Sequence, residues 1–173
     1  MRIRISLLTI LAVLTALIAF ASCGGHGRAQ RALDTSTNPA ASGASNTFAL
    51  EQASEGGKLT ATLNAQGFFD LYQVAGELGY DHGALELESV SQGAFLGAPP
   101  DVIFFQRGGE GRIPFAITRR NISAGSTGAG VILQAHFRIK ATLPEKAVWI
   151  GEKLLARDSL RHAIDASVVG GAK

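Results

Sequence analysis

The sequence predicts an all-β domain, a sandwich or a barrel, on three observations. Apolar and polar residues alternate with a period of two in several segments after residue 48, most clearly in residues 59–64 and 131–140. Turn-forming residues, including many of the 21 glycines, separate these segments. No convincing long helical pattern lies between them, and the predicted strands recur roughly every 8–15 residues, as in all-β domains.

The strands can be placed in chain order. One buried and one solvated face is expected for residues 59–64, 72–80, 85–88, 113–117 and 131–140. Pro114 marks its strand as an edge strand or as a strand start. Continuous apolar runs at 102–105 and 147–150 indicate central strands, with Trp149 in the core, and residues 163–169 make a last strand. Turns are expected at 81–83, 97–100, 108–111 and 125–130; residues 153–161 fit either a turn of helix or a strand with a loop.

The first 22 residues have the features of an export signal. Arg2 and Arg4 form a basic start, and residues 5–21 are uninterruptedly apolar or small, which is shorter than the roughly 20 residues of a membrane-spanning helix. Small residues immediately before Cys23 resemble the lipobox of bacterial lipoproteins, although Phe20 stands where that family usually has Leu. This predicts cleavage before Cys23, lipidation of Cys23 and anchoring to the outer membrane or cell surface. Ordinary signal cleavage after Ala21, which gives a soluble secreted protein, is the alternative.

Residues 23–47 are expected to be a flexible tether, or alternatively a disordered N-terminus without a role, and residues 48–173 a single domain. The tether is rich in Gly, Ala, Ser, Thr and Asn, and Leu33 is its one large apolar residue, so it buries too little surface to order itself. As a coil it would span on the order of 25 Å.

Composition argues against several functions. The formal charge of +2 falls to 2 − 2 = 0 once Arg2 and Arg4 are removed. The sequence has no stripe of basic residues with interleaved aromatics, so nucleic-acid binding is not expected. No carboxylate pair or activated nucleophile marks a catalytic site, so we do not expect an enzyme. The chain has four histidines, His26, His82, His136 and His162. They lack the spacing of metal ligands, and we predict neither a metal nor a cofactor. Cys23 is the only cysteine, which excludes an intramolecular disulfide.

Several segments, in order, resemble the cohesin domain. Residues 70–81 end in Tyr80-Asp81 like a cohesin strand, and residues 83–90 follow as a turn and a Leu-containing strand. Residues 93–97 resemble the family's Gly-x-Phe-Leu segment, and residues 128–141 its glycine-rich lead into a long alternating strand. The resemblance implies a jelly-roll β-sandwich of about nine strands that binds proteins and catalyses nothing. Cohesins bind dockerin domains, mostly through one sheet face.

The resemblance also indicates a binding face, with one departure. Many dockerin-binding cohesins expose an Asn and, two residues later, an Asp on the strand that ends in Tyr-Asp, where this chain has Gln73 and Ala75. We therefore predict partner recognition on the face of Gln73, Ala75 and Glu77, with the dockerin of an exported polysaccharide-degrading enzyme as the implied partner. Two alternatives stay open: a carbohydrate-binding module on the same fold, and a structural envelope lipoprotein that acts as an adaptor.

Overall fold

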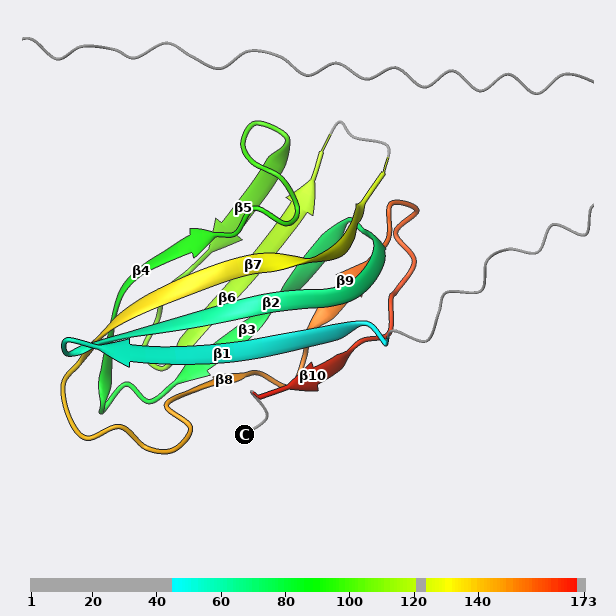
Figure 1. The fold of residues 1–173 in the computed structure, drawn as a ribbon. Helices are drawn as coiled ribbons and strands as arrows, with labels where there is room; N and C mark the ends of the chain where they lie inside the picture. The colour runs from blue at the N-terminus through cyan, green and yellow to red at the C-terminus, as the bar shows by residue number, and fades with distance from the viewer. Residues whose placement is uncertain (1–44, 121–123, 171–173) are drawn as a thin grey trace, which may run out of the picture. The chain divides into compact units, whose positions relative to one another are not determined.

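The computed structural model describes residues 45–120 and 124–170, which form two packed β-sheets (Figure 1). Sheet A has the order β10-β1-β2-β7-β4; sheet B has the order β5-β6-β3-β8, and β9 also pairs with β3. The ten strands of the described residues are β1 (Thr47–Glu55), β2 (Lys58–Leu71), β3 (Gln73–Tyr80), β4 (Leu85–Gln92), β5 (Val102–Gln106), β6 (Arg112–Arg119), β7 (Ser126–Ile139), β8 (Val148–Ile150), β9 (Leu155–Arg157) and β10 (Ser167–Val169). The predicted all-β sandwich is confirmed, with ten strands in this part instead of about nine. The predicted signal peptide, Cys23 and nearly all of the predicted tether lie outside the described residues.

Alternate residues of both sheets meet in one apolar core. The predicted alternation is confirmed in β2, where Leu59, Ala61 and Leu63 are buried, and in β6, where the odd-numbered apolar residues are buried. Aromatic pairs add directional contacts, with ring centroids 4.7 Å apart for Phe48 and Phe68. Tyr80 of sheet B lies 5.1 Å from Phe137 of sheet A. No polar or charged residue among the described ones is buried.

Both strands predicted to be central are edge strands. β5 pairs only with β6, and β8 lies with β9 along the free side of β3. A continuous apolar run is the pattern of a strand buried on both faces. In β5, however, two residues of the run, Ile103 and Phe105, point outward and are exposed. Hydrophobicity alone therefore misplaced both strands.

Two other segments differ from expectation. The predicted turn at 125–130 is largely the start of β7, whose residues pair with the bulged end of β2. The predicted last strand at 163–169 is shorter, because only β10 is a strand, parallel to β1, while Ala163 forms a single bridge to Arg157. Residues 153–161 resolve as a strand with a loop, since β9 is followed by a turn.

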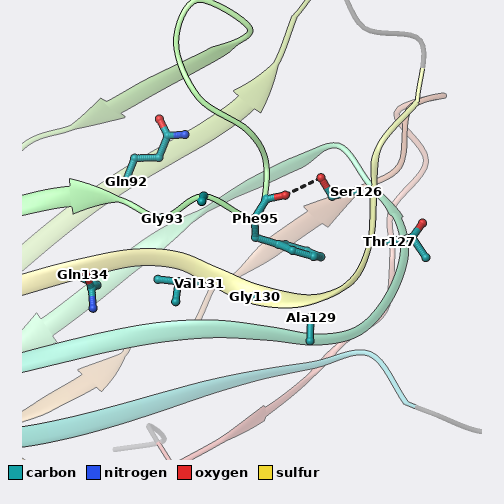
Figure 2. A pocket seen from close by; sticks show the side chains of 10 residues that line it. Gln92, Gly93, Phe95, Ser126, Thr127, Ala129, Gly130, Val131 and Gln134 are labelled. Atoms are coloured by element: carbon teal, nitrogen blue, oxygen red, sulfur yellow. Dashed lines mark hydrogen bonds between the residues drawn. The ribbon is translucent and has the colours of Figure 1, made fainter. Parts of the chain in front are cut away.

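Two of the motifs identified in the sequence lie side by side at the start of β7. The Gly93 and Phe95 amides donate to the carbonyls of Ile132 and Val131, over 2.8 and 3.1 Å. The Phe95 ring packs on Gly130, where a Cβ would come within 2.9 Å of it. Figure 2 shows the Ser126 hydroxyl donating to the Phe95 carbonyl at the edge of an open groove of about 680 Å³. Glycine is thus required here for close packing.

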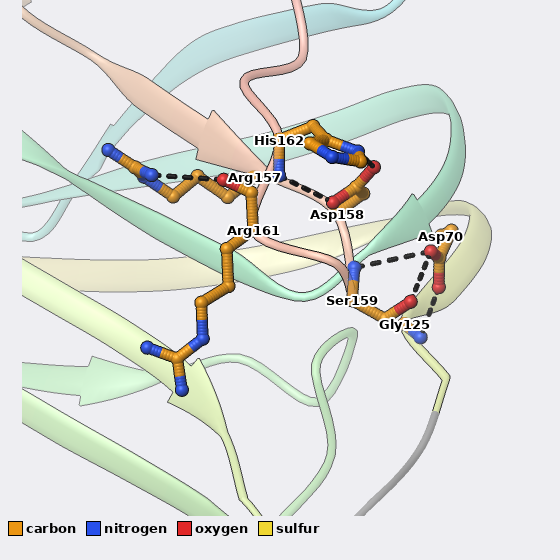
Figure 3. Close-up of polar contacts among 7 residues, drawn as sticks. All are labelled: Asp70, Gly125, Arg157, Asp158, Ser159, Arg161 and His162. Carbon is orange, nitrogen blue, oxygen red and sulfur yellow. Dashed lines mark hydrogen bonds and ion pairs between the residues drawn. The ribbon is translucent and has the colours of Figure 1, made fainter.

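One polar cluster ties the two sheets together at an end of the sandwich (Figure 3). Asp70, the penultimate residue of β2, has a left-handed φ of 59°. Its carboxylate accepts hydrogen bonds from the Ser159 hydroxyl at 2.6 Å, the Ser159 amide and the Gly125 amide. The Ser159 hydroxyl bond is the main cause that lowers the pKa of Asp70, and burial opposes it; both amides and Arg119 lower it further. The carboxylate therefore links β2 of sheet A to the turn that follows β9 of sheet B.

Candidate functional site: the outer face of sheet B

The three residues predicted to carry recognition do lie on one surface. In β3, Val74 and Leu78 are fully buried, and the alternation directs Gln73, Ala75 and Glu77 to the outer side of sheet B, where all three are partly exposed. β3 lies between β6 on one side and the pair β8 and β9 on the other, so this surface is the middle of the sheet face.

An apolar row crosses the face through Ala75. Ala75 lies opposite Ala116 of β6, which lies opposite Phe105 of β5; on its other side Ala75 lies opposite Leu155 of β9. Phe105 is 57% and Leu155 56% exposed, while the two alanines are partly exposed. Residues aligned across neighbouring strands touch the same side of the sheet. The result is an apolar strip in which two large side chains flank a shallow alanine floor.

Mostly polar and charged residues border the strip on both sides, with the 48% exposed Ile103 and Pro114 as apolar exceptions. On one side the cross-strand row is Ile103, Thr118, Gln73 and Arg157. On the other side Glu77 lies opposite Pro114, and its carboxylate lies 3.8 Å from the Arg112 guanidinium. Because the Arg112 side chain is 75% exposed and the contact is long, this ion pair contributes little stability. An apolar centre with a polar border is the anatomy of a protein-binding surface.

Trp149 belongs to this face and not to the core, so its predicted burial is wrong. It lies opposite Gly79 on β8, between the buried Val148 and Ile150, and it is only half-buried. A Cβ on Gly79 would come within 2.2 Å of the indole nitrogen, so the ring rests directly on this glycine. Beside it opens a groove of about 750 Å³ that Glu77, Arg112 and Lys153 also line.

Sequence reasoning missed most of this surface. Phe105 and Leu155 stood in segments interpreted as buried or undecided, and the row that unites them with Ala75 comes from strand register, which one sequence does not reveal. The sequence did hold one clue to the exposure of Trp149. Successive residues of a strand point to opposite faces, so Trp149 must point outward if Val148 and Ile150 point into the core.

Known proteins resemble this chain in structure but do not match it in sequence. No family model matches the chain, and no curated protein matches its sequence. The type II cohesin A11 from Bacteroides cellulosolvens superimposes with a TM-score of 0.63 at 13% identity, over 73% of this chain and 96% of that one. The sixth cohesin of Acetivibrio cellulolyticus scaffoldin B, solved in complex with a Cel5 dockerin, gives 0.63 at 19% identity over the same shares. A non-cellulosomal cohesin from Archaeoglobus fulgidus gives 0.59 at 17%, over 72% of this chain and 86% of that one.

The domain has a cohesin-like fold. Within it, the Tyr80-Asp81 pair that suggested the resemblance has structural roles. The Tyr80 hydroxyl donates to the Gly109 carbonyl at 2.7 Å, and the Asp81 carboxylate accepts from the amides of Gly83 and Ala84, as predicted for its turn. The resemblance in sequence therefore rests on residues that build the cohesin-like fold.

The described part of this cohesin-like domain has neither a metal-binding cluster nor a membrane-spanning helix. Across residues 45–120 and 124–170, no group of three or more His, Cys, Asp or Glu side chains is placed to hold a metal ion. The same part of the chain has no helix that is both long and apolar enough to cross a membrane.

Proposed function

We propose that this chain is a non-catalytic recognition module, held at the bacterial surface through Cys23 and the segment that follows it, which binds a protein partner on the outer face of sheet B. The observation that carries the proposal is the apolar row from Phe105 through Ala116 and Ala75 to Leu155. Large side chains more than half exposed in water lose free energy when a partner covers them, by roughly 25 cal/mol for each Å² removed from water.

The cohesin-like fold supports the choice of partner class. Cohesins of Acetivibrio cellulolyticus have been solved in complexes with dockerins, and such a domain is the partner we propose here. Ala75 changes how it would be recognised. An alanine side chain accepts no hydrogen bond, so the centre of this face recognises its partner through apolar burial, and Gln73 with the Glu77–Arg112 pair supplies polar contacts at the border.

A carbohydrate-binding role is the weaker alternative. The half-buried Trp149 beside a groove of about 750 Å³ favours it, since sugars stack on exposed aromatic rings. A flat polysaccharide site needs several such rings, and the chain has one Trp and two Tyr, of which Tyr80 is buried. The apolar row has no aromatic ring besides Phe105.

The test is a capture experiment with the chain lacking residues 1–22, immobilised through its C-terminus and exposed to the host's secreted and envelope proteins. Bound proteins are identified by mass spectrometry. We expect a dockerin-bearing enzyme on the parent protein and its loss on Ala75→Arg, which places a long cation at the centre of the apolar row.

The matched control is Ser91→Arg, which adds the same side chain to an exposed position of β4 in sheet A. This variant should capture the enzyme as the parent does. Equal loss with both variants would contradict the assignment to sheet B. Retention on an insoluble polysaccharide that Trp149→Ala abolishes, with no captured protein, would establish the carbohydrate alternative instead.

A further inference from the structure

The two most exposed large apolar side chains of the described residues lie away from the proposed partner face. Phe69 is 77% and Leu160 73% exposed, more than any residue of the apolar row. Phe69 precedes Asp70 and Leu160 follows Ser159, and Asp70 and Ser159 are joined by two hydrogen bonds (Figure 3). The two side chains therefore project from neighbouring segments held together by a fixed link.

This pair lies at the end of the sandwich where the chain enters it, which we call the proximal end. Thr47, the first residue of β1, lies opposite Gln66, so residues 67–71 of β2 extend past the start of β1. The side-chain Nδ2 of Asn46 donates to the Asp165 carbonyl at 3.0 Å, in the segment that follows the Leu160 turn. Figure 1 shows the start of β1, the turn after β2 and the segment after β9 together at one end.

We infer that the proximal end contacts the surface of a phospholipid bilayer, into which Phe69 and Leu160 insert. The inference rests on the proposed anchoring at Cys23, because only 21 residues (24–44) lie between that cysteine and Ser45, where the described domain begins. The coil predicted for this segment spans on the order of 25 Å, so the proposed anchor keeps this end of the domain within reach of the bilayer.

The side chains suit a membrane interface. Phe69 and Leu160 are the most exposed large apolar side chains of the described residues, so their transfer from water into an apolar medium is favourable. Arg161, next to Leu160, is exposed as well, and a basic residue beside an apolar one favours the anionic headgroup region. The fixed link between Asp70 and Ser159 reduces the entropy lost when both tips insert together.

The geometry also keeps the two sites apart. The apolar row crosses the outer face of sheet B, whereas Phe69 and Leu160 belong to segments at the proximal end, from which the strands extend away (Figure 1). The membrane contact and the protein partner then use different surfaces, and each can be removed by substitution without the other.

The experiment uses the chain without residues 1–22 and with Cys23→Ser, so that no acyl chain contributes. Trp149→Phe removes the native indole, and Phe69→Trp then places a single fluorescent reporter at position 69. We expect a blue shift of the emission with vesicles of phosphatidylethanolamine and phosphatidylglycerol. Sedimentation with the same vesicles gives the partition coefficient of the parent and of the variants that carry no tryptophan reporter.

Leu160→Ser and Phe69→Ser should each lower the partition coefficient roughly tenfold or more, the ratio for withdrawing one large apolar side chain. Phe105→Ser, which changes an exposed apolar residue on sheet B, is the matched control and should leave it unchanged. Thermal unfolding checks that each variant is folded, as its exposed position implies.

Three results would overturn the inference: no blue shift and no sedimentation with these vesicles, an equal loss with Phe105→Ser, or loss of captured protein with Phe69→Ser. The last would assign the tips to a protein interface. Capture on Ala75→Arg is measured separately, so failure of the membrane contact and failure of the partner face are distinguishable.

Discussion

The two outer faces of the sandwich present opposite surfaces to solvent although the same alternation builds both. On sheet A, Thr60 and Thr62 alternate with buried residues and bond across to β7: Thr60 to the His136 ring at 3.1 Å, and Thr62 to Gln134 at 3.3 Å. On sheet B the equivalent central row is apolar, with Phe105 and Leu155 on either side of Ala75. One face satisfies its polar groups within the sheet, and the other gains by being covered.

The largest effect should come from the core that supports both faces. Phe137 is fully buried in sheet A and packs on Tyr80 of sheet B, so Phe137→Ala leaves a cavity between the sheets. We expect a loss of about 3–5 kcal/mol in the free energy of unfolding, measured by urea denaturation. A loss of less than about 1 kcal/mol would mean that the sheets hold together without this contact.

The second prediction makes sheet B resemble sheet A. Replacing both Phe105 and Leu155 with Thr should lower the affinity for the captured partner about 100-fold, because central apolar side chains contribute most of the binding energy. Isothermal titration calorimetry measures the change, and unfolding should change little since both side chains are exposed. The counterpart Thr60→Val with Thr62→Val should leave affinity unchanged; a comparable loss there would erase the functional contrast between the faces.

The third prediction concerns the link between the sheets. Asp70→Ala removes three hydrogen bonds to the carboxylate and should lower the free energy of unfolding by about 1–2 kcal/mol at neutral pH. The folded state lowers the pKa of Asp70, so the carboxylate's contribution is present above its ordinary pKa of 3.8 and is lost as pH falls through the lower folded value.

Asp70→Asn is the matched variant for this pH dependence, since asparagine also tolerates the left-handed backbone. Its deficit relative to the parent should shrink as the pH is lowered below about 4. A deficit that stays constant between neutral pH and strongly acidic pH would show that Asp70 acts through its shape and not its charge.

The smallest effect is expected on the polar face. Glu86 and Arg138 form an exposed ion pair at one end of sheet A. Glu86→Gln should cost less than about 1 kcal/mol, shrink further at high salt and leave partner capture intact. Thermal unfolding at two salt concentrations measures it; a larger, salt-independent loss would give sheet A a structural role that its exposure does not suggest.

The sequence predicted the layers of this molecule better than their order. Alternation correctly separated Val74 from Ala75 and Leu63 from Thr62, because a period of two is set by the backbone itself. It could not place β5 and β8 at sheet edges, since strand order depends on long-range pairing. The apolar row was invisible for the same reason: Phe105, Ala75 and Leu155 become neighbours only through register.

The candidate site divides in the same way. Gln73, Ala75 and Glu77 were correctly placed on one outer surface by alternation, and their part in binding stays a prediction. Trp149 was assigned to the core because its neighbours are apolar, yet the small Gly79 opposite leaves room for the ring on the outside. A glycine on the facing strand was the decisive feature, and it lies 70 residues away in the chain.

The pairing of β1 has a mechanical consequence. A pull on the N-terminus acts along β1, whose nine residues all pair with β2 and whose first three also pair with β10 on the other side. Ladder hydrogen bonds run across the strands, so such a force shears the whole row at once instead of opening it one bond at a time. A force on a partner bound to sheet B would pass through the core to β1, which is paired on both sides. This arrangement suits a domain that bears mechanical load.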